Sequence, residues 1–164
     1  MDLFEFILIL ATLLCALTAG FVFAFASVVM PGIKNLGDRG FIRAFQVIDG
    51  VIQRGQPIFG LVWLGSAVAL VVAAVLGFWR LDGVERALLV VATLIYVFGV
   101  QAPTFAINVP LNNKLQELNV DAIDDVAIRS ARTGFEGRWV LWNSVRTVLA
   151  TCTCALLLTA MSIR

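Results

Sequence analysis

The sequence predicts an all-α membrane protein built as a bundle of four transmembrane helices. Composition is the first observation, because 60% of the 164 residues are hydrophobic and 14% are charged. A soluble domain carries about 45–50% apolar and about 25% charged residues. The second observation is that four apolar stretches are each long enough to cross a bilayer, which takes about 20 apolar residues. The length fits a single domain over residues 1–164.

The four predicted spans cover approximately residues 6–30, 57–79, 87–111 and 139–163. The first span is expected to stop at Pro31, and Pro57 suits the first turn of the second. The third span has no charged residue, and the fourth has a single one, Arg146.

Small residues recur at four-residue spacing on three of the spans. Such stripes allow helix backbones to approach closely in lipid. They indicate packing within the bundle, with a dimer interface as the alternative. The stripes are Ala16, Gly20 and Ala24; Gly65, Ala69, Ala73 and Gly77; and Thr147, Thr151, Ala155 and Thr159.

The distribution of basic residues predicts the orientation in the membrane. The longer connections, residues 31–56 and 112–138, hold eight Lys and Arg residues, whereas the remaining connection and the termini hold three. Positively charged loops stay on the cytoplasmic side. We therefore expect a multi-pass protein of the plasma membrane, or of the inner membrane in a bacterium, with both termini outside.

The connection between the first two spans contains a predicted amphipathic helix over residues 39–54. This pattern is typical of an interfacial helix that lies at the membrane surface or over the mouth of a bundle. Its apolar side holds Phe41, Phe45, Ile48 and Ile52, and its polar side holds Arg39, Arg43, Gln46, Asp49 and Gln53.

A short helix is also expected between the third and fourth spans. Asp121, Asp124 and Asp125 place acidic side chains where a helix begins, and the helix dipole favours them there. Gly134 is the expected end of this helix.

Charge and residue types exclude several classes of function. A net charge of +1 argues against nucleic-acid binding. The absence of histidine removes the commonest general base, metal ligand and haem ligand. Cys15, Cys152 and Cys154 lie within apolar runs and are interpreted as packing residues. We therefore expect no metal site and no cofactor.

Polar residues inside the third and fourth spans are the strongest indication of a site, because such groups usually face a partner or a cavity. On the fourth span Trp139, Trp142, Asn143 and Arg146 share one helical face. On a straight third helix, one face would hold Gln101, Thr104, Phe105, Asn108 and Asn112.

Prolines interrupt the third span. Pro103 and Pro110 each leave the carbonyl four residues earlier, at Gly99 and Ala106, without its helical donor. Broken helical backbone is tolerated in a membrane where it lines an enclosed cavity.

Depth along the helices predicts that these polar groups meet. At about 1.5 Å per residue, Arg146 lies roughly 10 Å inward from Trp139, and Gln101 lies equally far inward from Asn108. Gln46 and Asp49 lie on the loop helix above the same end. The prediction is one pocket of amides, a guanidinium, a carboxylate and aromatic walls. The alternative is separate roles, in which the amides join helices, the tryptophans form an interfacial belt and the arginine snorkels.

The chain resembles the anthrone oxygenase-like family of small four-span membrane proteins. Four elements carry the likeness, and they cover nearly the whole chain in order. They are Gly20-Phe21 through Val29-Met30-Pro31, Phe45-Gln46-x-x-Asp49, Asn108-Val109-Pro110-Leu111-Asn112-Asn113 and Trp139-x-x-Trp142-Asn143-x-x-Arg146. One departure is Asp49, which stands where the family pattern leads us to expect asparagine.

The resemblance implies oxidation of an anthrone-like or other hydrophobic aromatic small molecule by O₂, without metal or flavin. On this hypothesis a catalytic group removes a proton and stabilises the resulting oxyanion. Arg146, Asn108, Asn112 and Asn143 would donate to the oxyanion, and Asp49 would be the base. The substrate-binding residues would be Gln46, Gln101, Phe105, Trp139 and Trp142.

A second hypothesis is a membrane protein without enzymatic activity. The same pocket could serve a partner subunit, or a binder or carrier of a lipid, a quinone or another amphiphile. An ion or proton path is less favoured, because Arg146 is the one firm charge inside the predicted spans.

Overall fold

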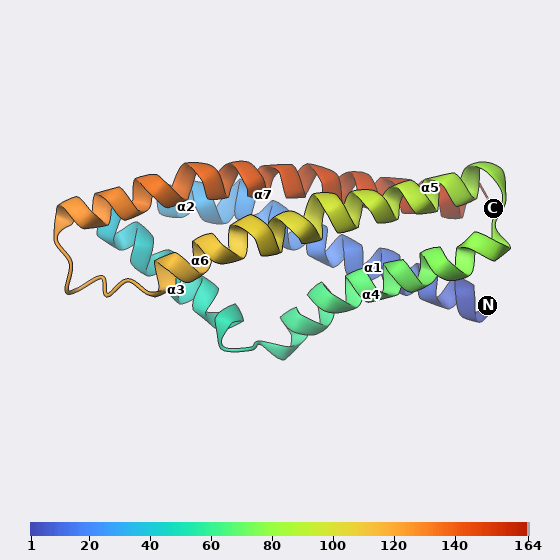
Figure 1. Ribbon diagram of the computed structural model, residues 1–164, viewed down its shortest axis with the longest axis horizontal. Helices are drawn as coiled ribbons and strands as arrows, with labels where there is room; N and C mark the ends of the chain where they lie inside the picture. Colours follow the sequence, from blue (N-terminus) through green and yellow to red (C-terminus); the bar gives the residue numbers. More distant parts are fainter. Residues whose placement is uncertain (164) are drawn as a thin grey trace.

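The computed structural model describes residues 1–163, and every regular element in that range is helical. Long helices lie side by side in an elongated bundle (Figure 1). The start of the first helix and the end of the last helix lie at one end of this bundle, and α3 with the loop before α7 lies at the other (Figure 1). We refer to the latter as the loop end.

The first long helix runs from Leu3 to Lys34 without a break. It consists of α1 (Leu3–Ala24), the π-helical segment η1 (Phe25–Val29) and α2 (Met30–Lys34). The Asp2 and Glu5 side chains form a reciprocal capping box at its start. The predicted stop at Pro31 is therefore one turn early.

The next two elements are α3 (Asp38–Gln53) and α4 (Pro57–Arg80). The side chain of Gln56 accepts a hydrogen bond from the Phe59 amide at 2.8 Å and so caps α4. Gly55 has a φ of +79° in the turn between the two helices, a conformation that favours glycine.

The third long helix runs from Gly83 to Gln116 and changes its winding on the way. Its parts are α5 (Gly83–Leu94), η2 (Ile95–Gln101), η3 (Thr104–Asn108) and α6 (Val109–Gln116), with η2 and η3 π-helical. The last helix, α7, covers Asp125–Ser162, and the Asp124 side chain caps it by accepting from the Ala127 amide at 2.8 Å.

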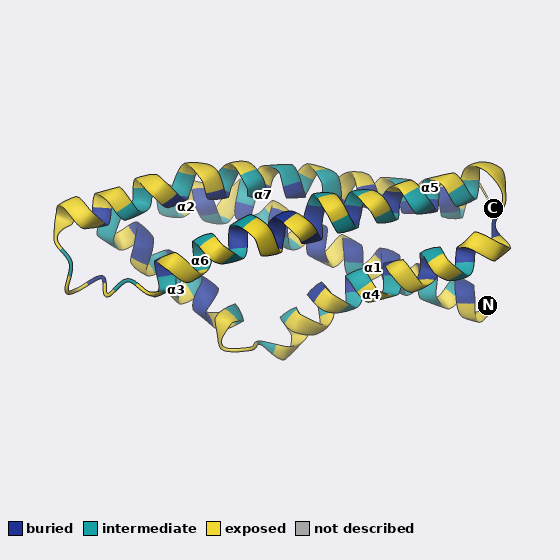
Figure 2. Ribbon diagram, viewed as in Figure 1, coloured by how far each residue is buried: buried dark blue, intermediate teal, exposed yellow. Residues whose placement is uncertain are grey.

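Four helices are therefore long and apolar enough to cross a membrane: Leu3–Lys34, Pro57–Arg80, Gly83–Gln116 and Asp125–Ser162. Their outward faces are exposed (Figure 2), and many of the side chains there are large and apolar; Leu61 is 71% exposed and Phe98 67%. A surface of this kind suits a lipid environment.

The expectation of a separate short helix ending at Gly134 is wrong. The helix begins at Asp125, as the acidic residues predict. It does not end at Gly134, however, because α7 continues through this residue into the fourth span and is 38 residues long. The reason is that Gly134 keeps a negative φ, since only Gly55 and Gly83 have positive values. A glycine ends a helix when it adopts the left-handed conformation.

Each π-helical segment is associated with a proline two residues after its end: Pro31 after η1, Pro103 after η2 and Pro110 after η3. A proline cannot donate to the carbonyl four residues earlier, and that carbonyl belongs to the π-helical segment in all three cases. The backbone there forms bonds over five residues instead, such as Val109 N–H to the Thr104 carbonyl.

The amphipathic helix α3 packs against α2, α6 and α7 at the loop end. Phe41 and Phe45 are buried, as its apolar side predicts. Its polar side is exposed only in part: Arg43 and Gln53 are exposed, whereas Asp49 is only 3% exposed and Gln46 donates to the carbonyls of Leu115 and Leu118 at 2.7 and 3.0 Å. Polar contacts with α6 thus hold α3 across the end of the bundle.

Only one of the three small-residue stripes packs inside the bundle. On α4, a Cβ at Gly77 would lie 2.5 Å from a Leu89 methyl and 3.1 Å from the Phe4 ring. By contrast, Gly20 on α1 and Thr151 on α7 are exposed. The interpretation as intramolecular packing therefore holds for the second span, and the other two stripes face outward.

Replacing Gly77 with leucine should destabilise the bundle by about 1–3 kcal/mol, because the added side chain overpacks the contact with Leu89 and Phe4. The measurement is SDS-induced unfolding in detergent micelles. Gly20→Leu is the matched control, since nothing lies within 4 Å of a Cβ at that position. An equal loss in both variants would contradict tight packing at Gly77.

Candidate functional site

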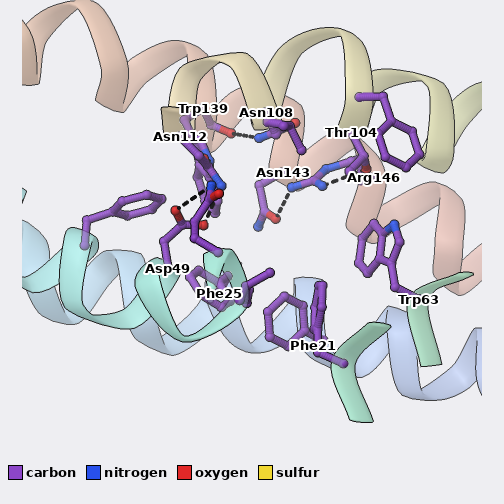
Figure 3. A pocket seen from close by; sticks show the side chains of 16 residues that line it. Phe21, Phe25, Asp49, Trp63, Thr104, Asn108, Asn112, Trp139, Asn143 and Arg146 are labelled. Carbon is purple, nitrogen blue, oxygen red and sulfur yellow. Dashed lines mark hydrogen bonds between the residues drawn. The ribbon is translucent and has the colours of Figure 1, made fainter. Parts of the chain in front are cut away.

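A cavity of about 300 Å³ lies near the loop end, enclosed by the first helix, α3, α4, η3, α6 and α7. Seven of the ten predicted site residues line it. They are Asp49, Phe105, Asn108, Asn112, Trp139, Asn143 and Arg146. The labelled polar side chains point toward one another across this space (Figure 3).

The other three predicted residues, Gln46, Gln101 and Trp142, do not line the cavity. Gln46 instead donates to the carbonyls of Leu115 and Leu118, and these bonds hold α3 against the end of the third helix. Gln101 is buried and donates to the Trp63 carbonyl at 3.5 Å rather than meeting Arg146. Because a π turn contains one residue more than an α turn, the face expected for a straight helix is not kept through η2 and η3.

Arg146 is a buried cation without a carboxylate partner in the described chain. Its side chain is 4% exposed, and it donates to Thr104 Oγ1 and to Asn143 Oδ1, each at 2.9 Å. Its Nε atom is buried without a partner. The guanidinium carbon lies 6.0 Å from the centre of the Trp139 ring, which adds a weak cation–π attraction. The guanidinium therefore retains donor capacity.

Asp49 is a buried anion held only by amides within the described residues. Its Oδ1 accepts from Asn112 at 2.8 Å, and its Oδ2 accepts from Gln116 at 2.9 Å and from Gln53 at 3.2 Å. No ion pair joins it to Arg146 in residues 1–163. The cavity thus has a carboxylate on one side and a guanidinium on the other (Figure 3).

Amide and indole groups connect these two charges. Trp139 Nε1 donates to Asn112 Oδ1 at 2.7 Å, and Asn143 Nδ2 donates to the Val22 carbonyl at 3.0 Å. Asn108 Nδ2 makes a long bond of 3.4 Å to the Trp139 carbonyl, and its Oδ1 is buried without a partner. A buried orphan acceptor is unfavourable, and in this cavity it is available to a ligand.

Aromatic residues that our sequence interpretation missed form the opposite wall. Phe21 packs on Phe59 with ring centres 5.1 Å apart, and Phe59 stacks on Trp63 at 5.5 Å. The signal was present as aromatic pairs four residues apart, Phe21 with Phe25 and Phe59 with Trp63. The remaining lining residues outside the predicted set are Phe45, Ile52, Gln53, Thr104 and Val109.

The donor set of the cavity suits an organic anion. Within residues 1–163 there is no group of three or more Cys, Asp or Glu side chains close enough to hold a metal ion. The guanidinium and the asparagine amides supply hydrogen-bond donors, and the aromatic rings supply flat apolar surface. This combination can bind a planar molecule that carries one negatively charged oxygen.

The fold and the site define an α-helical protein with four apolar helices around a polar, aromatic-walled cavity. The family described as anthrone oxygenase matches residues 49–156, which is more than half of the chain. The chain therefore belongs to the anthrone oxygenase family. No curated protein and no solved structure matches it.

Replacing Arg146 with methionine should leave the free energy of unfolding unchanged or raise it by about 1–3 kcal/mol. The reason is that it removes a buried charge with no counter-ion and keeps most of the side-chain volume. SDS-induced unfolding measures the change. Leu157→Ala, a fully buried truncation in the same helix, should cost about 2–5 kcal/mol. A comparable loss in the methionine variant would make Arg146 a structural residue.

Proposed function

We propose that this protein is a membrane oxygenase that oxidises an anthrone-like or other hydrophobic aromatic substrate with O₂, and that it needs no cofactor. The observation that carries the proposal is the buried Arg146 guanidinium, which has an unpartnered Nε and no carboxylate partner in the described chain. A buried charge is costly unless it is paired. A substrate oxyanion would supply the missing counter-charge.

The proposal includes a single domain over residues 1–164 in a multi-pass topology. The connections 31–56 and 112–138 would be cytoplasmic and both termini outside, in keeping with the distribution of Lys and Arg.

The size and walls of the cavity support a compact aromatic substrate. Ligand cavities in proteins measure about 300–1,000 Å³, and this one, about 300 Å³, is at the compact end of that range. Three fused rings present two flat faces, for which Trp139 lies on one side of the cavity and Phe21 and Trp63 on the other (Figure 3).

The first chemical step is the loss of a proton from the CH₂ group of the substrate. Asp49 is the proposed base, and its hydrogen bonds to Asn112, Gln116 and Gln53 orient the carboxylate. The electron pair moves onto the ring carbonyl and forms an enolate. The proposed donors to this oxygen are Arg146 and the second amide hydrogens of Asn108, Asn112 and Asn143.

The second step is the reaction of the enolate with O₂. The enolate transfers one electron to O₂, and the resulting radical pair forms a carbon–oxygen bond, which gives a peroxide. The peroxide takes up a proton; loss of the remaining C–H proton then forms the new carbonyl and breaks the O–O bond, which expels hydroxide, and the hydroxide takes up a proton to give water. In the balanced reaction a CH₂ group and O₂ become a C=O group and H₂O, so the substrate supplies all the electrons.

Arg146→Gln should lower the rate of O₂ consumption with an anthrone by about 10²–10³-fold, the usual loss when one oxyanion donor is removed. An oxygen electrode with the protein in detergent measures this rate. Because Arg146→Met is expected to fold at least as well as the wild type, the same loss in that variant separates catalysis from folding. Full activity in either variant would rule out the oxyanion role.

Asp49→Asn should lower the rate at neutral pH by about 10²-fold or more, because a carboxamide cannot accept the proton. This change also installs the residue that the family pattern leads us to expect. The rate should recover as the pH rises, since the substrate then loses its proton in solution and binds as the enolate. Arg146→Gln should show no such recovery. A pH-independent loss in Asp49→Asn would argue against a base at this position.

The wild-type protein provides the test of the whole proposal. If it consumes no O₂ across a panel of anthrones and related phenols but retains a quinone or lipid on purification, then the cavity serves binding alone.

A further inference from the structure

Two walls of the cavity that contains Arg146, α4 and η3, do not pack closely on each other, and we refer to the space between them as the opening. Along its length α4 packs against α1, α5 and η2, whereas η3 packs against η2, α6 and α7. The two helices diverge toward the loop end, so that the start of α4 and the start of α6 lie well apart (Figure 1). Phe59 and Trp63 of α4 line the cavity, as do Phe105 of η3 and Val109 at the start of α6.

Two lining residues of the cavity are exposed, Gln53 at the loop end and Phe105 beside the opening. Phe105 is 61% exposed, so its ring stands at the boundary between the cavity and the surroundings. The outward surface of α4 is strongly exposed and apolar, with Ile58 at 68%, Leu61 at 71% and Leu64 at 64%. In a protein that spans a membrane, a surface of this composition faces hydrocarbon.

At the loop end, by contrast, hydrogen bonds join α3 to the third helix, and the exposed lining residue Gln53 takes part in them. Asp49 of α3 accepts from Asn112 and Gln116 of the third helix, and Gln53 donates to Asn113 Oδ1 at 3.0 Å. Near the start of α3, Arg39 donates to the carbonyl of Ile123 at 2.9 Å. Ile123 lies just before the start of α7. A ligand that came from this side would have to break several of these bonds at once.

We propose that the substrate reaches the cavity from within the bilayer, through the opening between α4 and η3, and that Phe105 controls its passage. This inference rests on the proposed function, because it takes the substrate to be a flat hydrophobic molecule. Such a molecule concentrates in the hydrocarbon phase, since burial of its apolar surface is favourable there. A molecule that entered by this opening would reach the buried Arg146 donors without passing the carboxylate at the loop end.

The test blocks the opening reversibly and follows binding rather than turnover. Cysteine is introduced by Phe105→Cys in a background with Cys152→Ala and Cys154→Ala; Cys15 is buried and is kept. A benzyl methanethiosulfonate attaches a bulky group through a disulfide, which dithiothreitol removes. Phe98→Cys is the matched control, because Phe98 is 67% exposed on the same long helix and does not line the cavity.

Association is measured in phosphatidylcholine vesicles with anthraquinone, which has the product's ring system and is not oxidised further. It should quench the fluorescence of Trp63 and Trp139, which line the cavity. The label at position 105 should slow the quenching by about tenfold or more, within the range of association rates among variants of one site. Dithiothreitol should restore the rate. The label at position 98 should change it by less than about twofold.

The outcomes distinguish this inference from the proposed function. Equal quenching rates with the label at either position would overturn the route through the opening. Absence of quenching in the unlabelled protein would overturn the route and the aromatic ligand together. A third outcome is that the label at position 105 blocks quenching while the protein consumes no O₂ with an anthrone. This result would support the route and reject the oxygenase.

Discussion

The buried Arg146 guanidinium is the group on which the arrangement of the loop end depends. In an apolar bundle a cation needs either a counter-ion or several hydrogen-bond acceptors, and the described residues offer it only the Thr104 hydroxyl and the Asn143 amide oxygen. Asn143 is in turn fixed by its bond to the Val22 carbonyl of α1. The requirement to solvate one charge therefore connects the first, third and fourth long helices around the cavity.

Irregular backbone surrounds Thr104 and Asn108 where they line the cavity. Pro103 and Pro110 flank η3, and each proline follows a π-helical segment that contains the carbonyl it leaves without a donor. An uninterrupted α-helix would keep Gln101 on the same face as Thr104 and Asn108, whereas here Gln101 bonds to α4. The prolines therefore allow this helix to stay continuous while it presents Thr104, Asn108 and Asn112 on the side of the cavity.

The helix α3 provides the second charge. Its carboxylate, Asp49, lies outside the predicted spans. Asp49 is nevertheless buried, and the side-chain amides of Asn112 and Gln116 donate hydrogen bonds to it. As a result the cavity has its polar groups at the loop end and on α7, and its aromatic wall on the first helix and α4 (Figure 3). This separation suits a ligand with a polar edge and apolar faces.

The sequence by itself determined the helical class, the four long apolar helices, the acidic helix start at Asp124 and Asp125, and the concentration of polar residues in the third and fourth helices. It also indicated the anthrone oxygenase family, whose description matches residues 49–156. These features follow from local composition and spacing. Helical spacing also predicted most of the site, since seven of the ten predicted site residues line one cavity.

The tertiary structure decided which faces meet. Helical periodicity assumes regular winding, so it placed Gln101 beside Arg146, whereas the π turns direct it to α4. In lipid, an apolar side chain is favourable both inside and outside a bundle. Hydrophobicity therefore could not distinguish the cavity-lining Phe21 from the exposed Phe23, or the packed Gly77 from the exposed Gly20. Only the positions of the neighbouring helices decide which of these residues is packed inside the bundle.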